Sequence, residues 1–185
     1  MFLKINVLVL FLAFCNLGYT QTVKVVSKKG TLIDIEQGVG NVLEAYVGTP
    51  TVSQTLTSTF ADIAFSNFGI VDISDFTRSG VLIMINKPGR YEITYRVSTT
   101  INNNERSGGE FYLEVGGTEA PGTRAYTCAR NSLVDKNTVA VTKTIETTTA
   151  NVTVKLKGRT YASTAAVPSL TMTNNGSSLL IKRIK

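Results

Sequence analysis

Histidine, the commonest general base in enzymes, does not occur in this 185-residue chain, which limits the catalysis it can support. Cys128 would need an activating base to act as a nucleophile, so we interpret it as a small, buried strand residue. A hydrolytic pair could be drawn from Glu105, Glu110 and Glu119, but their positions do not indicate the carboxylate separation of roughly 5–10 Å that glycosidases use. We therefore expect that the chain is not an enzyme.

Three aspartates suggest at most a cation site. Asp72 and Asp75 flank Ile73-Ser74, and together with Asp62 they could bind a cation through their carboxylate oxygens. Aspartates at such positions more often accept hydrogen bonds from the amides of a turn. We favour the turn interpretation and predict neither a metal nor another cofactor.

Tyrosine and arginine side chains in predicted loops and strand ends are better candidates for binding a ligand, because both residue types contribute strongly to interfaces. Residues 102–109 have the composition of a long polar hairpin loop. The candidates for ligand contact in this loop and elsewhere are Asn103, Arg106, Tyr126, Arg130 and Tyr161. The alternative for both tyrosines is burial on strand faces or between chains, where they would only stabilise the protein.

The positive charge of the chain is concentrated at its C-terminal end. The formal net charge is +6, and no acid follows Glu146, whereas six cations do: Lys155, Lys157, Arg159, Lys182, Arg183 and Lys185. Such an end favours anionic partners such as lipopolysaccharide, acidic glycans or nucleic acid. The alternatives are a solvated face or neutralisation of acids across a subunit boundary. Nucleic acid is the least expected partner, because no basic and aromatic recognition motif is present.

The first 20 residues differ from the rest of the chain. Lys4 precedes an apolar stretch at residues 5–15, interrupted only by Asn6, as in a secretory signal peptide that would be cleaved after Thr20. The alternative is an N-terminal membrane anchor, although a spanning helix needs about 20 apolar residues. We interpret residues 21–50, which end in Gly48-Thr49-Pro50, as an extension or linker, and residues 51–185 as the main domain.

The remaining residues indicate short β-strands separated by turns. Pro88-Gly89 predicts a turn, and after it Tyr91, Ile93, Tyr95 and Val97 alternate with polar residues. Residues 110–115 repeat this alternation with Phe111 and Leu113, and residues 152–157 repeat it again. Strands of this kind, spaced by Gly and Asn turns, are typical of an all-β sandwich, jelly-roll or barrel.

Several motifs in this order resemble the globular head of the C1q/TNF family. Phe-Thr-Arg-Ser-Gly at 76–80, the next strand and Lys87-Pro88-Gly89-Arg90-Tyr91 are similar to its signature, and Ala-Phe-Ser-Asn at 64–67 is similar to the Phe-Asn element before it. Residues 111–117 resemble the strand that ends in Asn-Gly, with Gly116 in place of Asn, and residues 176–181 resemble the closing strand. The likeness covers residues 51–185. The chain departs from animal C1q proteins in having no collagen-like stalk.

Residues 106–130 resemble the variant of this family that occurs in phage and viral structural proteins. The resemblance implies a ten-stranded jelly-roll β-sandwich, preceded here by the N-terminal hydrophobic segment, and assembly as a homotrimer. It implies that the fold or trimer core contains Tyr91, Ile93, Tyr95, Phe111, Leu113, Leu179 and Ile181.

The resemblance also implies a non-enzymatic trimeric structural protein of the virion surface, of the spike, decoration or fibre-head type. Such a protein presents loops for host attachment, and its partners are other virion proteins or a host-surface glycan or receptor, with membrane contact through residues 1–20. The alternative is a secreted, extracellular C1q-like protein that binds cell-surface glycans or other ligands. A secreted hydrolase on a β-sandwich is the third class.

Overall fold

The computed structural model describes residues 21–26, 32–37, 41–47, 54–79, 81–101, 106–129, 136–161, 170–173 and 175–184. The chain divides into two compact units, residues 1–40 and 41–185. No helix in the described ranges is long and apolar enough to span a membrane. Residues 1–20, for which we predict a signal peptide or an anchor, lie outside these ranges.

The first unit contains one antiparallel hairpin. Its strands are β1 (Gln21–Val26) and β2 (Leu32–Gln37), paired from Gln21 opposite Gln37 to Val26 opposite Leu32. The hairpin lies within residues 21–50, the segment interpreted as an extension or linker.

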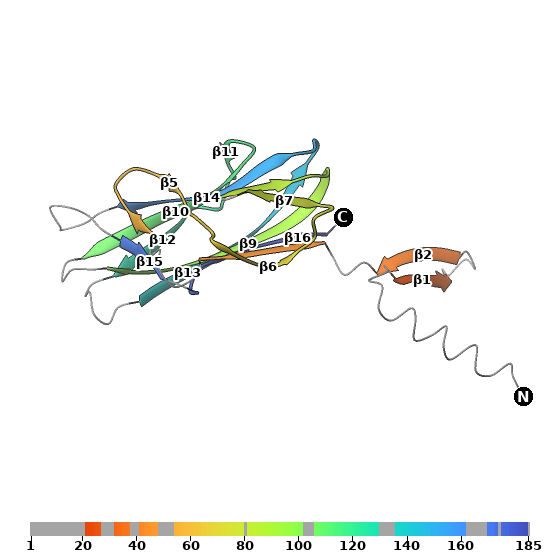
Figure 1. Ribbon diagram of the computed structural model, residues 1–185, viewed down its shortest axis with the longest axis horizontal. Helices are drawn as coiled ribbons and strands as arrows, with labels where there is room; N and C mark the ends of the chain where they lie inside the picture. The colour runs from red at the N-terminus through yellow and green to blue at the C-terminus, as the bar shows by residue number, and fades with distance from the viewer. Residues whose placement is uncertain are drawn as a thin grey trace, which may run out of the picture. The chain divides into compact units, whose positions relative to one another are not determined.

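The second unit contains two antiparallel sheets of seven strands each (Figure 1). Ten of these strands have four or more residues, and the other four are pieces of two or three residues. The longer strands are β3 (Val42–Tyr46), β6 (Asn67–Val71), β7 (Phe76–Ser79), β8 (Leu82–Ile85), β9 (Gly89–Ile101), β10 (Ser107–Val115), β12 (Ala125–Ala129), β13 (Lys136–Thr147), β14 (Val152–Tyr161) and β16 (Ser178–Arg183). The short ones are β4 (Thr55–Leu56), β5 (Ala61–Asp62), β11 (Thr118–Glu119) and β15 (Leu170–Met172).

Each sheet is organised around one long strand. In the first, called the β10 sheet, the strand order is β11-β10-β14-β8-β7, with β12 added on β10 and β5 on β14. In the second, called the β9 sheet, the order is β4-β15-β9-β16-β3-β6, with β13 added on β9. Side chains from both sheets form one buried hydrophobic cluster, as expected of a sandwich.

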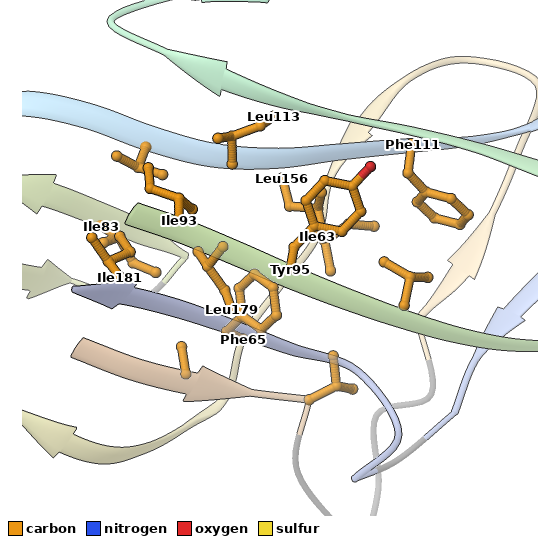
Figure 2. Close-up of a cluster of buried hydrophobic side chains, with 14 of the residues drawn as sticks. Ile63, Phe65, Ile83, Ile93, Tyr95, Phe111, Leu113, Leu156, Leu179 and Ile181 are labelled. Atoms are coloured by element: carbon orange, nitrogen blue, oxygen red, sulfur yellow. The ribbon is translucent and has the colours of Figure 1, made fainter. Parts of the chain in front are cut away.

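The seven predicted core residues lie inside this cluster, each at most 1% exposed. Figure 2 shows Phe111 and Leu113 of the β10 sheet near Tyr95, Leu179 and Ile181 of the β9 sheet. The alternation of apolar and polar residues in β9, β10 and β16 places these side chains inward. Because they are buried within one chain, they hold the two sheets together and leave any contact between chains to other residues.

The start of the sandwich differs from the expected residue 51. The second unit begins at Asn41, and β3 pairs with β16 and β6 before Pro50 is reached. Leu43 and Ala45 of β3 are fully buried, so the strand is an integral part of the core. A single five-residue strand beside Gly48-Thr49-Pro50 carries too little periodicity to be assigned to the sandwich from sequence.

Glycine allows close packing around Phe111. Gly158 of β14 lies directly opposite Phe111 of β10, and a Cβ atom at Gly158 would lie 2.8 Å from the Phe111 ring and 2.9 Å from Ile63. The phenylalanine ring therefore occupies the volume that a side chain at position 158 would fill. This close approach explains a glycine within the strand, where it otherwise weakens pairing.

Candidate ligand-contact surface

The outward face of the β10 sheet carries the clearest candidate site. Register pairs Glu110 of β10 with both Tyr126 of β12 and Arg159 of β14, and pairs Gly108 with Tyr161. Residues opposite one another share a face, so these side chains lie on one side of three neighbouring strands. We call this surface the tyrosine face.

Tyr126 and Tyr161 form an exposed aromatic pair across the central strand. Their ring centroids are 5.2 Å apart with an interplanar angle of 62°, an edge-to-face geometry. The side chains are 52% and 40% exposed. Gly108 makes the pair possible, because a Cβ atom there would lie 2.8 Å from the Tyr161 ring.

A buried carboxylate supports the surface beside the tyrosines. Glu110 is only 4% exposed and accepts hydrogen bonds from Arg159 and Arg124, with Arg159 Nε 2.7 Å from its Oε2. The Tyr126 hydroxyl lies 3.5 Å from Oε1 of the same carboxylate. Arg124 also binds Glu119, its Nε donating at 3.0 Å. The two arginines are thereby held in fixed positions next to the tyrosine pair.

These contacts keep Glu110 ionised. Burial acts to raise the pKa of Glu110, but hydrogen bonds and charge from Arg159 and Arg124 outweigh it and lower the pKa below its ordinary value of 4.5. A carboxylate with a lowered pKa is a poor proton donor at neutral pH, so its position here suits an anchor for arginines better than a general acid.

Phe60 packs against Tyr112 and the two arginines beside the tyrosine pair. Its ring meets Tyr112 edge to face at 4.9 Å between centroids, and the Arg159 guanidinium lies 4.4 Å from its centroid. Arg124 stacks on the Tyr112 ring at 5.0 Å. Each arginine thus makes both an ion pair and a cation–π contact, which restricts its motion.

The structure brings together two of the five predicted contact residues, Tyr126 and Tyr161. Arg106 is exposed at the start of β10, whereas Asn103 and Arg130 lie outside the described residues. Sequence reasoning missed Glu110 and Arg124 as supports of the surface. The available signal was an acid at an outward position of one strand, together with Arg124 just before β12 and Arg159 in β14.

Cys128 is exposed, and the expectation that it is buried was wrong. In β12 the buried positions are Ala125, Thr127 and Ala129, so Tyr126 and Cys128 both point outward. Thr127 tolerates the interior because Thr99 donates a hydrogen bond to its hydroxyl at 3.1 Å. Hydrophobicity alone predicts that Cys128 is buried and Thr127 exposed, and the structure shows the reverse.

The aspartates considered as cation ligands lie in separate ion pairs or in a turn. Asp62 binds Lys155 and Lys157, whereas Asp75 is fully buried and binds Lys87 at 2.6 Å and Arg183 at 3.1 Å. Burial raises the pKa of Asp75, but its hydrogen bonds from Lys87 and Asn41 and the charge of Arg183 lower it overall. Within the described residues no cluster of acids and cysteines fits a metal ion.

Of the three aspartates, Asp72 fits the turn interpretation, whereas Asp62 and Asp75 lie in ion pairs. Its carboxylate accepts a hydrogen bond from the amide of Ser74 at 2.9 Å, and its carbonyl accepts from the amide of Phe76 at 3.0 Å. The segment therefore forms the tight connection between β6 and β7.

The C-terminal cations are largely neutralised by acids from earlier in the chain. Besides the lysine pairs of Asp62, Arg159 binds Glu110 at 2.6 Å and Arg183 binds Asp75. Lys185 lies outside the described residues. These pairs neutralise much of the cationic end within one chain, which differs from the expected alternative of neutralisation across a subunit boundary.

The outward face of the β9 sheet has a different composition. Thr94 of β9 lies opposite Thr142 of β13 and Leu180 of β16, and the two threonine hydroxyls are 2.9 Å apart. Arg96 lies opposite Ala140 in the adjacent row. Leu180 is 39% exposed although its neighbours Leu179 and Ile181 are buried. We call the surface formed by Thr94, Arg96, Ala140, Thr142 and Leu180 the threonine face.

Comparison with known proteins supports the fold. No protein-family model and no curated protein matches the chain. Among solved structures, the globular domain of zebrafish complement 1qA protein superimposes with a TM-score of 0.52 at 11% identity, covering 79% of this chain and 98% of that domain. Murine APRIL at pH 5.0 gives 0.49 at 11% identity, covering 78% of this chain and 99% of that one. The predicted all-β jelly-roll of the C1q-like type is confirmed.

Proposed function

We propose that this chain is a non-enzymatic, trimeric binding protein that contacts its ligand through the tyrosine face. The observation that carries the proposal is the exposed pair of Tyr126 and Tyr161. Two large aromatic side chains held in water beside immobilised arginines are typical of interfaces, where rigid aromatic groups bind at little entropic cost.

The chemistry of the tyrosine face suits a glycan. The apolar face of a sugar ring packs on an aromatic ring, while tyrosine hydroxyls and arginine N–H groups serve its hydroxyls or acidic substituents. Arg159 and Arg124 lie at this surface with their positions set by Glu110. A host-surface or other cell-surface glycan is therefore the ligand class that we propose.

We place this function on the surface of a virion, in host attachment, because residues 106–130 resemble the phage and viral variant of the family. These residues include β10 and β12, which carry Gly108, Glu110 and Tyr126 of the tyrosine face. A secreted C1q-like binding protein is the second candidate, favoured by the same glycan-compatible chemistry. Detection of the chain in purified virions by mass spectrometry would support the first, and release into the medium without particles would support the second.

Self-association is proposed to use the threonine face. Thr94, Ala140 and Thr142 are short, and beside the half-exposed Leu180 they leave a surface that another copy can approach closely; an exposed leucine gains from burial. Because the seven core residues are buried within one chain, contacts between chains must come from such outward positions.

Mutation of the tyrosines tests the binding surface. Tyr126→Ala and Tyr161→Ala in the full chain are expected to abolish binding to a glycan array and to host cells, while the mass from light scattering stays unchanged. Ile70→Ala is the matched control, because it removes a 69% exposed apolar side chain elsewhere. Dissociation of the assembly by the tyrosine variants would place these residues between chains and overturn the proposal.

Light scattering tests the trimer separately. The wild-type chain is expected at three times its own mass, and Leu180→Lys is expected to dissociate it, because a charge at a packed interface must lose its hydration. Ile184→Lys changes a similarly exposed residue four positions later and serves as the control. A monomeric wild type, or a trimer that tolerates Leu180→Lys, would contradict this assignment.

A further inference from the structure

A second, independent site lies where the sandwich opens between its two edge strands. β6 is the last strand of the β9 sheet, and β7 is the last strand of the β10 sheet. Between them and the loop that follows β5 is a cavity of about 590 Å³. Its volume falls within the roughly 300–1,000 Å³ typical of small-molecule sites. It is lined by Gln54, Ala64, Phe65, Ser66, Phe68 and Val81, with Arg78 at its rim.

The walls of this cavity are mainly apolar. Phe65 is 3% exposed and belongs to the hydrophobic core, whereas Phe68 is half-buried and Val81 is 46% exposed. The cavity therefore extends from the core toward solvent. An apolar molecule that entered it would lose contact with water along most of its length, which favours binding.

The backbone beside the cavity is held in place without a ligand. The Gln54 side chain donates to the Asp62 carbonyl at 2.7 Å and accepts from the Ala64 amide at 2.9 Å. Both of these polar atoms of Gln54 are thus used to fix the loop that carries Ala64 and Phe65. Gln54 positions the wall, which leaves Arg78 as the charged group facing the opening.

Arg78 supplies the charge at the rim. Its guanidinium carbon lies 4.4 Å from the centroid of the Phe68 ring, which orients the side chain across the opening. Arg124, Arg159 and Arg183 each bind a carboxylate, but in the described part of the chain Arg78 forms no ion pair. Stacking occupies the face of the guanidinium and leaves its N–H edge for an anion, preferably a carboxylate that it binds with two hydrogen bonds.

We propose that this cavity binds a small molecule with an apolar body and one terminal carboxylate, such as a medium-chain fatty acid. The apolar body lies against Phe65, Phe68 and Ala64, and the carboxylate binds Arg78. The site is separate from the tyrosine face and shares none of its residues, so it does not depend on the function proposed above.

Calorimetric titration of the full chain with decanoate tests this site, with 1-decanol and decyltrimethylammonium as uncharged and cationic analogues. Decanoate is expected to bind saturably with one molecule per chain, and about tenfold more tightly than either analogue, because hydrogen bonds to charged groups are among the strongest. Equal binding of decanol, or no saturable binding of decanoate, would overturn the proposal.

Variants of the rim then assign the anion contact. Arg78→Gln is expected to weaken decanoate about tenfold or more while leaving decanol unchanged. Val81→Asp puts a negative charge at the opening and is expected to shift the preference toward decyltrimethylammonium. Arg90→Gln removes an exposed arginine outside the cavity and should bind decanoate like the wild type. An unchanged affinity in Arg78→Gln would exclude Arg78 as the carboxylate ligand.

Discussion

The tyrosine face and the threonine face are the outward surfaces of the two sheets, yet they have different physical characters. On the first, a buried carboxylate, two arginines and aromatic rings contact one another across β12, β10 and β14. On the second, a threonine pair and Leu180 lie beside Ala140 and Arg96, and the ion pair of Arg90 in β9 with Glu146 in β13 is exposed. Both surfaces arise from the same alternation of residues along strands.

The difference shows that cross-strand neighbours decide what a sheet surface can do. Glu110 becomes buried and ionised because β12 and β14 place Tyr126 and Arg159 on either side of it. Thr94 has neighbours too small to form such a network. Long, interlocked side chains give a rigid surface for recognition, whereas short ones leave a flat surface that a second chain can cover.

The largest difference between the faces is expected when the carboxylate of Glu110 loses both arginines. Arg124→Met with Arg159→Met leaves Glu110 charged, buried and unpaired, so the double variant should lose about 3–5 kcal/mol of unfolding free energy in urea titrations. Arg90→Met on the other sheet removes one partner of an exposed pair and should change stability by less than about 0.5 kcal/mol. Similar losses of unfolding free energy in both variants would contradict the difference that we infer between the two faces.

The response to acid is the next largest expected difference. Folding lowers the pKa of Glu110, so the stabilisation it provides is present above the ordinary value of 4.5 and is lost as the pH falls through the folded-state pKa. Glu110→Gln should therefore lower the unfolding free energy at neutral pH by about 1.5–3 kcal/mol. It should also reduce how much the unfolding free energy falls as the pH is lowered. Folding also lowers the pKa values of Asp75 and Asp62, so part of the loss of stability in acid should remain in this variant.

Urea midpoints measured between about pH 7 and pH 2.5 report how stability changes as the pH falls. Glu146→Gln is the matched control, since it changes an exposed glutamate at the edge of the β9 sheet. If stability fell with pH as steeply in Glu110→Gln as in the wild type, Glu110 would not be the source of this pH dependence.

Double-mutant cycles compare the central pair of each face. The coupling between Tyr126 and Tyr161, from the two alanine variants and their combination, should be about 0.5–1.5 kcal/mol. The coupling between Thr94 and Thr142 should be about 0.2–1 kcal/mol. If the threonine face packs between chains, only the second coupling should depend on protein concentration. Concentration dependence of the tyrosine coupling would reverse the roles of the two faces.

The smallest effect is expected at Cys128. Its side chain points outward next to Tyr126, so Cys128→Ser should change the unfolding free energy by less than about 0.5 kcal/mol. Thr127→Val, which removes a buried hydroxyl that Thr99 hydrogen-bonds, should cost more, about 1–3 kcal/mol. A larger loss for the cysteine variant would place its side chain in the interior.

Much of the fold could be predicted from the sequence, because alternation in long strands is a strong local signal. It identified the inward residues of β9 and β10 and the turn before β9, whereas Leu179 and Ile181 of β16 were expected from the family resemblance. It failed for short strands, so β3 was placed in the linker, and for β12, where Cys128 and Thr127 contradict the hydrophobic order of the two faces. Five residues give too few repeats to distinguish the two registers.

By itself, the sequence determined which residue types are present and which neighbours along one strand share a side. The absence of histidine removes the usual base, and the period of two in β9 requires a sheet with one buried face. Only the tertiary structure decided which strands are adjacent. The contacts of Glu110 with Arg159, of Tyr126 with Tyr161 and of Arg78 with Phe68 all join different strands. Pairing between strands depends on the packing of the whole sandwich, which no local pattern of residues specifies.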